Sequence, residues 1–153
     1  MKILLATDGT KESDSALEMV KTLKLAAGDS ILIISVIDMA LPLAIDIYGG
    51  YLPDTSEIET AAKDHASKAL ERCSVDLNEH LKDLNIAIET ELLFGSPDSR
   101  IIEIAERIDA DLIVLGSHGY NAWERLLLGS VSNSVVHHAA CSVLVVRSRK
   151  PAE

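Results

Sequence analysis

Short apolar runs that alternate with longer segments of helical periodicity are the feature that most restricts the fold of this chain. Most of these runs lack the in-and-out alternation of a strand with one solvated face, so we expect parallel strands buried on both faces. The runs are Lys2–Thr7, Ser30–Ile37, Ile86–Phe94, Leu112–Leu115 and Val143–Val146. The third run does alternate, which predicts a half-exposed strand at an edge of the sheet. The pattern predicts an α/β domain with an open parallel five-stranded sheet and helices on both faces, spanning residues 1–153.

The segments between the runs carry helix signals. Apolar residues recur at helical spacing after the first run, with Ser13 as the predicted N-cap and Gly28 as the predicted stop. A long helix is predicted over 57–84, and another begins with Ser96 as N-cap and Pro97 at the first helical position. Residues 38–56 are irregular but apolar, and either cover the sheet or a partner or close over a ligand.

Composition and charge exclude several classes of function. The net charge is −10, which argues against a nucleic-acid or anionic membrane surface, since either needs a clustered basic face. An anionic ligand must therefore be held by local dipoles. No apolar run approaches the roughly 20 residues of a membrane span, and the N-terminus does not resemble a signal peptide. Cys73 and Cys141 are far apart without a C-x-x-C spacing, so we expect a cytoplasmic location.

A glycine-rich segment follows the fourth run. The strand ends in Gly116, Gly119 comes after two residues, and Gly129 and Ser130 open a helical pattern that ends at His138. A strand, a glycine-rich loop and a helix N-terminus in this order can hold a phosphate by backbone N–H groups. The spacing matches neither G-x-G-x-x-G nor the P-loop. The first run ends in a second candidate segment, 7–9, and ligands of such sheets bind where the strand order reverses. A flavodoxin-like order remains open at this point.

The glycine spacing resembles the nucleotide-binding signature of the universal stress protein family in its ATP-binding branch, which reads G-x-x-G, nine residues, G-[ST]. Gly116, Gly119, Gly129 and Ser130 match it, and the segments ILLATDGT, ISVID and GSVSNSVVHHAACSVLVVR are also similar to that family. The resemblance covers nearly the whole chain. It implies a Rossmann-like, adenine nucleotide alpha hydrolase-like fold with strand order 3-2-1-4-5, which places Asp8 and Gly116 on adjacent strands.

The resemblance and the chemistry of these residue types together predict a nucleotide site. Glycines let the backbone approach phosphate closely, and the first amides of the last helix favour an anion. Hydroxyls of Ser130 and Ser132 are expected to add donors. The family places adenine against the first strand and the backbone of the second, and the ribose or a phosphate-bound Mg²⁺ near Asp8. The predicted binding residues are Ala6, Thr7, Asp8, Val36, Gly116, Ser117, His118, Gly119, Gly129, Ser130, Val131 and Ser132.

Two of these residues have a second interpretation. Asp8 can equally be a turn-forming residue that caps the next helix, because Asp and Gly favour turns. His118 can be a solvent-facing loop residue that does not contact phosphate. His65 and His80 have no ligand spacing with each other or with a cysteine, so we expect no metal site built by the protein alone.

The predicted ligand is ATP, with ADP or AMP as alternatives, accompanied by Mg²⁺. Hydrolysis would call for a lysine on the terminal phosphates, and no lysine lies between Lys82 and Lys150. We therefore expect a regulatory or stress-response nucleotide sensor with little or no hydrolysis and no catalytic residue. Two alternatives stay open: a dimeric interaction module without a nucleotide cycle, and a weak ATP hydrolase or adenylyl-transfer enzyme.

The last run bears on assembly. In the implied order, Ser142–Arg147 lies at an edge of the sheet, and its apolar side chains invite pairing with another chain. We expect a two-fold homodimer through antiparallel pairing of this strand. The predicted partners are thus an adenine nucleotide and a second copy of the chain, with neither nucleic acid nor membrane.

Overall fold

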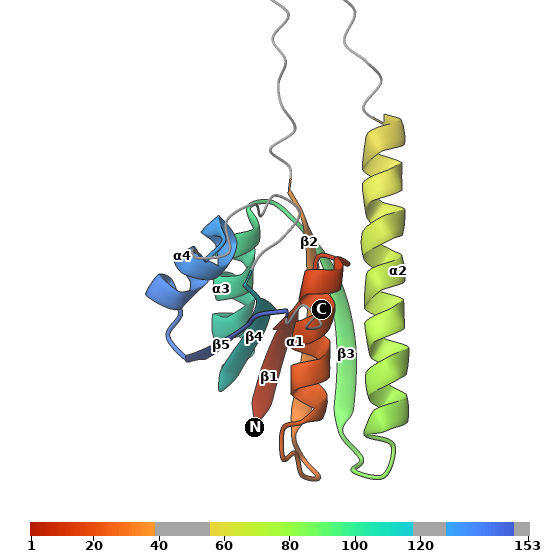
Figure 1. Ribbon diagram of the computed structural model, residues 1–153, viewed down its shortest axis with the longest axis vertical. Helices are drawn as coiled ribbons and strands as arrows, with labels where there is room; N and C mark the ends of the chain where they lie inside the picture. The colour runs from red at the N-terminus through yellow and green to blue at the C-terminus, as the bar shows by residue number, and fades with distance from the viewer. Residues whose placement is uncertain (39–55, 118–127, 149–153) are drawn as a thin grey trace, which may run out of the picture.

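The computed structural model describes residues 1–38, 56–117 and 128–148, and all structural statements below concern these residues. Strands and helices alternate along the whole chain (Figure 1). In chain order they are β1 (Lys2–Ala6), α1 (Lys11–Lys21), β2 (Ser30–Ile37), α2 (Ser56–His80), β3 (Ala87–Phe94), α3 (Pro97–Arg107), β4 (Leu112–Gly116), α4 (Ser130–His138) and β5 (Ser142–Val146).

The five strands form one parallel sheet in the order β3-β2-β1-β4-β5. The predicted fold class and strand order are confirmed, and so is the edge position of β3. The order reverses between β1 and β4, which is where such sheets bind ligands. Ala6 pairs with Leu115, so the carboxyl ends of these two central strands are level with each other.

Helices cover both faces of the sheet. Ile3 and Leu5 of β1 point toward a core cluster that includes residues of α1 and α2, whereas Leu4 points toward a second cluster that includes α3 and α4. Successive residues of a strand alternate between faces, so one short apolar run supplies both clusters. None of the described helices has the length and apolar character needed to cross a membrane.

The start and the end of α1 differ from the prediction. Thr10 is the N-cap and accepts a hydrogen bond from the backbone N–H of Ser13 at 3.3 Å. Ser13 is buried inside the first turn, so its prediction as the N-cap was wrong. The helix ends at Lys21 with Thr22 as C-cap, and Gly28, at φ +94°, lies in the turn before β2. Gly28 therefore permits a turn conformation that other residues resist, and it does not end the helix.

The long helix α2 ends at His80, short of the predicted Leu84. Its first turns also lack the burial that the apolar pattern suggested, since Ile58 is 56% exposed and buried side chains begin only at Ala66. The reason is geometric: α2 runs past the carboxyl end of the sheet, so its first turns have no strand beneath them (Figure 1). The predicted irregular segment 38–56 falls almost entirely outside the described residues.

Candidate functional site

The β1 end of the site is fixed by Thr7. Its backbone N–H donates to the carbonyl oxygen of Ile34 at 2.9 Å, which continues the β1–β2 ladder by one residue. Its hydroxyl is buried, shares a 3.0 Å hydrogen bond with the Ser13 hydroxyl and accepts from the N–H of Gly9 at 3.2 Å. The Thr7 side chain is therefore engaged within the turn after β1. The part of Thr7 that lies at the end of the strand is its backbone.

Asp8 acts as a turn-forming residue before α1, which is one of the two interpretations given for it above. Its Oδ1 accepts from the backbone N–H of Thr10 at 3.0 Å and from the Thr10 hydroxyl at 2.6 Å. These bonds orient Thr10 as the N-cap of α1. They engage one carboxylate oxygen, and a carboxylate has acceptor capacity on both. Asp8 is thus held in place by its turn role while its other oxygen keeps the chemistry to bind a ribose hydroxyl or Mg²⁺.

Helix α2 contacts this turn directly, which sequence reasoning missed. Gly9 adopts φ +76°, and a Cβ on it would lie 2.7 Å from Cε1 of His65 and 3.1 Å from Cβ of Ala69. The sequence offered one signal, an Asp-Gly pair directly after a strand, but nothing in it identified the helix that packs there. His65 therefore borders the candidate site, although no role had been assigned to it.

The backbone of Val36 faces the same crevice. In a parallel strand, successive residues direct their N–H and C=O groups to opposite sides. The carbonyl of Ile34 accepts from Thr7 on the β1 side, and the carbonyl of Ile37 accepts from Gly95 on the β3 side. Val36 is two residues after Ile34, so its N–H and C=O groups also point toward β1. They lie beyond the last residue of that strand. This is the position from which a backbone can recognise an adenine edge.

Ser117 closes the base of the glycine-rich loop. Its N–H donates to the carbonyl oxygen of Val146 at 2.8 Å, and its own carbonyl accepts from the N–H of Gly129 at 2.9 Å. The hydroxyl of Ser132 donates to the same carbonyl at 3.0 Å. Residues on the two sides of the loop are therefore joined at the end of β4. His118 and Gly119, both predicted binding residues, lie outside the described residues.

The N-terminus of α4 begins at this junction. Gly129 is the N-cap without a side chain, and its carbonyl accepts the helical hydrogen bond from Asn133 at 2.9 Å. The first helical amides belong to Ser130, Val131 and Ser132, and the first turn contains no acidic residue. Amides at this position carry the positive end of the helix dipole and suit an anion.

The two serine hydroxyls differ. Ser130 is exposed, so its hydroxyl remains a candidate donor to phosphate. Ser132 is buried, and its hydroxyl donates to the carbonyls of both Ser117 and Gly129. The expectation that the Ser132 hydroxyl contacts phosphate does not fit this geometry, because a hydroxyl has one proton to donate. Its observed contacts instead hold α4 against the end of β4.

A carboxylate outside the predicted site also fixes α4. Asp98, in the first turn of α3, accepts from the hydroxyls of Ser96 at 2.6 Å and Ser134 at 2.7 Å. These hydrogen bonds, that from Ser96 first, lower the pKa of Asp98 below its ordinary value of 3.8. Ser96 is the N-cap residue as predicted, although its side chain bonds to Asp98 and makes no capping bond to the backbone. The Ser134 contact was not visible in the sequence because 36 residues separate the partners.

The described residues include no group of three or more His, Cys, Asp or Glu side chains that could hold a metal ion. Within the described part of the site, Asp8 is the carboxylate that would contribute to a cation carried by a nucleotide. The junction, the turn after β1 and the backbone of β2 bring mainly main-chain polar groups to the point where the strand order reverses, which in sheets of this kind is a ligand-binding crevice. Such a crevice suits the binding of a phosphorylated ligand.

Comparison with known proteins agrees with this fold. The model of the universal stress protein family matches residues 1–147. A Staphylococcus aureus (strain USA300) relative named as a universal stress protein is 37% identical over 150 residues, which are 97% of this chain and 84% of the relative. A solved universal stress protein in complex with cAMP has a TM-score of 0.60 and 23% identity, and covers 96% of each chain. An Arabidopsis thaliana family protein with AMP bound has a TM-score of 0.64 and 19% identity over 97% of this chain and 92% of that one. The chain therefore belongs to the universal stress protein family.

Proposed function

We propose that this universal stress protein binds ATP with Mg²⁺, with ADP or AMP as alternative ligands, and serves as a regulatory nucleotide sensor with little or no hydrolysis. The observation that carries the proposal is the junction at Ser117, whose carbonyl holds both Gly129 and Ser132. It fixes the N-terminus of α4 at the strand-order reversal, where backbone amides favour phosphate. The adenine nucleotides bound to two solved family structures, AMP and cAMP, support the same ligand class.

The roles proposed for the remaining residues follow from their positions. The backbone of Val36 would recognise the adenine edge beside Ala6 and Thr7, and Asp8 would contact the ribose or Mg²⁺. Gly116 and Gly119 would let the backbone pass close to the phosphates, with His118 beside them. The amides of the first α4 turn would hold the phosphates by charge-assisted hydrogen bonds. The proposal of little or no hydrolysis rests on chemistry: no lysine is available in the loop to stabilise charge on the transferred phosphoryl group.

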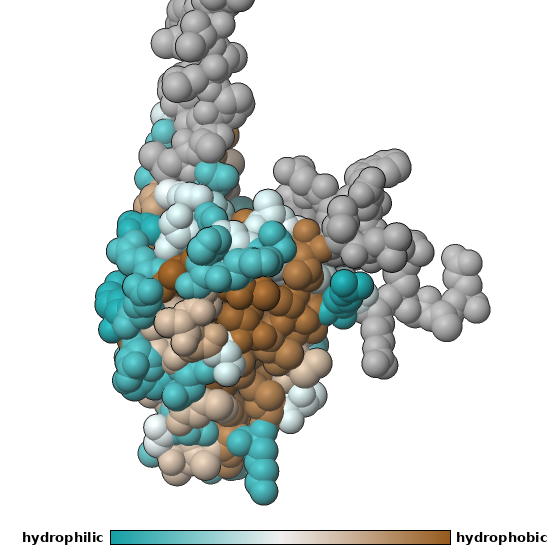
Figure 2. Space-filling view, turned by 90° about the vertical axis from the view of Figure 1, so that its left-hand side faces the viewer, coloured by the Kyte–Doolittle hydropathy of each residue, from teal (hydrophilic) through white to brown (hydrophobic). Residues whose placement is uncertain are grey.

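We also propose that the protein is a cytoplasmic homodimer paired through β5. The carbonyl of Val146 faces β4. Successive residues of a strand direct their N–H and C=O groups to opposite sides, so those of Val143 and Val145 point away from the sheet. Val136 of α4 is 43% exposed. Figure 2 shows apolar side chains gathered on the side where Figure 1 places α4 and β5. The thiols Cys73 and Cys141, which are free, fit a reducing compartment.

The direct test is to denature freshly purified protein and identify the released small molecules by mass spectrometry. Titration calorimetry of ligand-free protein with ATP and Mg²⁺ follows, together with a phosphate-release assay. We expect an adenine nucleotide in the extract and a saturable heat with ATP. An extract without adenine nucleotide combined with no heat would overturn the proposal. Turnover at rates typical of ATPases would instead favour the enzyme alternative.

A charge at the first position of α4 tests where the phosphates sit. Ser130→Glu places a carboxylate among the amides that hold phosphate, so ATP affinity should fall at least about ten-fold through charge repulsion. The same carboxylate favours a helix N-terminus, so the free energy of unfolding should stay constant or rise by about 0.3–1 kcal/mol. Ser99→Glu makes the matched change in the first turn of α3 and should leave affinity intact. Equal affinity of both variants would place the phosphates elsewhere.

A further inference from the structure

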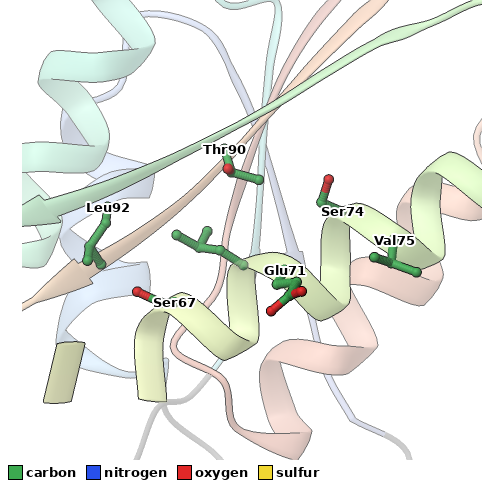
Figure 3. Close-up of a pocket in the computed structure, with 7 residues that line it drawn as sticks. Ser67, Glu71, Ser74, Val75, Thr90 and Leu92 are labelled. Carbon is green, nitrogen blue, oxygen red and sulfur yellow. The ribbon is translucent and has the colours of Figure 1, made fainter. Parts of the chain in front are cut away.

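The outer edge of β3 and the helix beside it form a groove on the side of the sheet opposite β5. The groove has a volume of about 440 Å³ and lies between α2 and β3. Figure 3 shows Ser67, Glu71, Ser74 and Val75 on the helix, and Thr90 and Leu92 on the strand. Its lining combines hydroxyl groups with aliphatic side chains, and Glu71 is the charged group among its lining residues.

The strand presents main-chain groups along this groove. β3 is the last strand in the sheet order, and β2 is its neighbour on the inner side. Gly95 donates to Ile37 of β2, so residues of the opposite parity, Ile88, Thr90 and Leu92, direct their N–H and C=O groups outward. Such an edge is a template for another strand.

The protein protects one end of this edge. The carbonyl of Phe94 also points outward, and it accepts a hydrogen bond from Nε of Arg100 at 2.9 Å. The ammonium of Lys63 lies 5.4 Å from the centre of the Phe94 ring. The outward-facing groups from Ile88 to Leu92 have no such cover among the described residues. Five residues of strand span roughly 16 Å, which is the length of a five- or six-residue peptide.

The charges around the edge indicate the character of the peptide. Side chains of an added strand would alternate between the α2 face and the α3 face. Glu71 stands on the α2 face, and Glu89 is exposed on the α3 face, where neighbouring Glu91 is paired with Arg107. Neither Glu71 nor Glu89 forms an ion pair within the described chain. Both faces of the added strand would thus meet an uncompensated carboxylate.

We propose that the β3 edge binds a basic, extended peptide segment of another protein, which joins the sheet as an additional strand. The main chain of the peptide would pair with Ile88, Thr90 and Leu92, and main-chain pairing would supply the affinity. Small apolar side chains would enter the groove beside α2, and basic side chains would approach Glu71 and Glu89. The outward-facing groups of β3 point away from β2 and from the nucleotide crevice, so the site does not depend on the ligand proposed there.

The probe is the capped peptide acetyl-Val-Arg-Lys-Val-Val-Lys-amide, which places basic side chains on both faces of an added strand. It is titrated into ¹⁵N-labelled full-length protein and followed by NMR. We expect saturable shifts centred on Ile88, Thr90 and Leu92. The same peptide with glutamate at the basic positions should not bind. N-methylation of the alternate amides that face β3 should abolish binding, whereas N-methylation of the other set should not. This pair of peptides separates strand addition from charge attraction alone.

Variants of the protein sharpen the test. Glu71→Lys should weaken binding at least about five-fold, the loss expected of one partly exposed ion pair. Glu57→Lys carries the same charge change about 21 Å further along α2 and should leave binding intact. Thr90→Pro removes the outward N–H, which an edge strand tolerates, and should abolish the shifts. Far-UV circular dichroism checks that each variant is folded.

Three results would overturn the proposal. One is the absence of shifts at millimolar peptide, and another is binding that Glu71→Lys and Glu57→Lys weaken equally. The third is broadening of the β3 signals with protein concentration in the absence of peptide, since that would assign the edge to a second copy of this chain.

Discussion

Replacing Gly9 by alanine tests how the turn after β1 is built. At φ +76° a Cβ costs roughly 1–2 kcal/mol. The added methyl would also lie 2.7 Å from Cε1 of His65 and 3.1 Å from Cβ of Ala69. The imidazole is exposed and can move to a poorer rotamer, at about 0.5–1.5 kcal/mol. We therefore expect Gly9→Ala to lower the free energy of unfolding by about 1.5–3.5 kcal/mol.

Gly28 provides a matched control, because it has φ +94° and, among the described residues other than its two chain neighbours, no heavy atom lies within 4 Å of the place that an added methyl would take. Gly28→Ala should therefore show the backbone cost alone, about 1–2 kcal/mol. Introducing His65→Ala together with Gly9→Ala should recover roughly 0.5–1.5 kcal/mol, and the contact with Ala69 should account for what remains. Urea denaturation followed by far-UV circular dichroism measures all three.

Two outcomes would refute this reasoning. If Gly9→Ala costs no more than Gly28→Ala, the turn does not pack against α2 as described. If His65→Ala fails to reduce the cost of Gly9→Ala, the imidazole is not the group in contact. The same variants should be titrated with ATP. A Gly9→Ala protein that is destabilised but binds ATP normally would show that the turn does not need this conformation to bind nucleotide.

Three further predictions concern other regions. Val145→Pro removes an outward N–H of β5, so analytical ultracentrifugation should show a monomer while the fold is retained; a persistent dimer would refute β5 pairing. Hydrogen bonds lower the pKa of Asp98 in the folded protein, so its contribution to stability is present above its ordinary value of 3.8 and is lost as the pH falls through the folded pKa. The unfolding free energy of Asp98→Asn should accordingly fall less than that of wild type between about pH 5 and pH 2, measured by urea denaturation. Cys73 is 1% exposed and burial raises its pKa, so a thiol reagent at pH 8 should label half-buried Cys141 first and Cys73 only on unfolding; mass spectrometry of the labelled peptides would reveal the opposite order.

Much of the fold could be predicted from the sequence, because each strand is a short apolar run and the helices between them are long and periodic. The strand order came from the family resemblance, since hydrophobic pattern alone does not order parallel strands. The residues at which the helices begin and end were harder to predict. Ser13 and Thr10 are both good N-caps by residue type. Thr10 takes the role because Asp8 orients it and because it accepts the capping hydrogen bond from the backbone N–H of Ser13.

The candidate site was predictable to the extent that it depends on glycine spacing. The Ser117–Gly129 pairing follows once the loop is known to return to the end of β4. The contacts of His65 with Gly9 and of Asp98 with Ser134 were not predictable, because they join elements distant in sequence whose relative height depends on packing. The bonds of the Ser132 hydroxyl to the carbonyls of Ser117 and Gly129 were not predictable either, because a serine allows both a ligand contact and a structural contact.

The junction at Ser117 has a practical consequence for mutagenesis. The carbonyl of Ser117, the amides at the start of α4 and the polar groups of Val36 are all main-chain atoms, and alanine retains every one of them. An alanine scan of these positions would therefore leave their main-chain donors and acceptors in place. Replacing single amides by esters would delete one donor at a time and leave the side chains untouched.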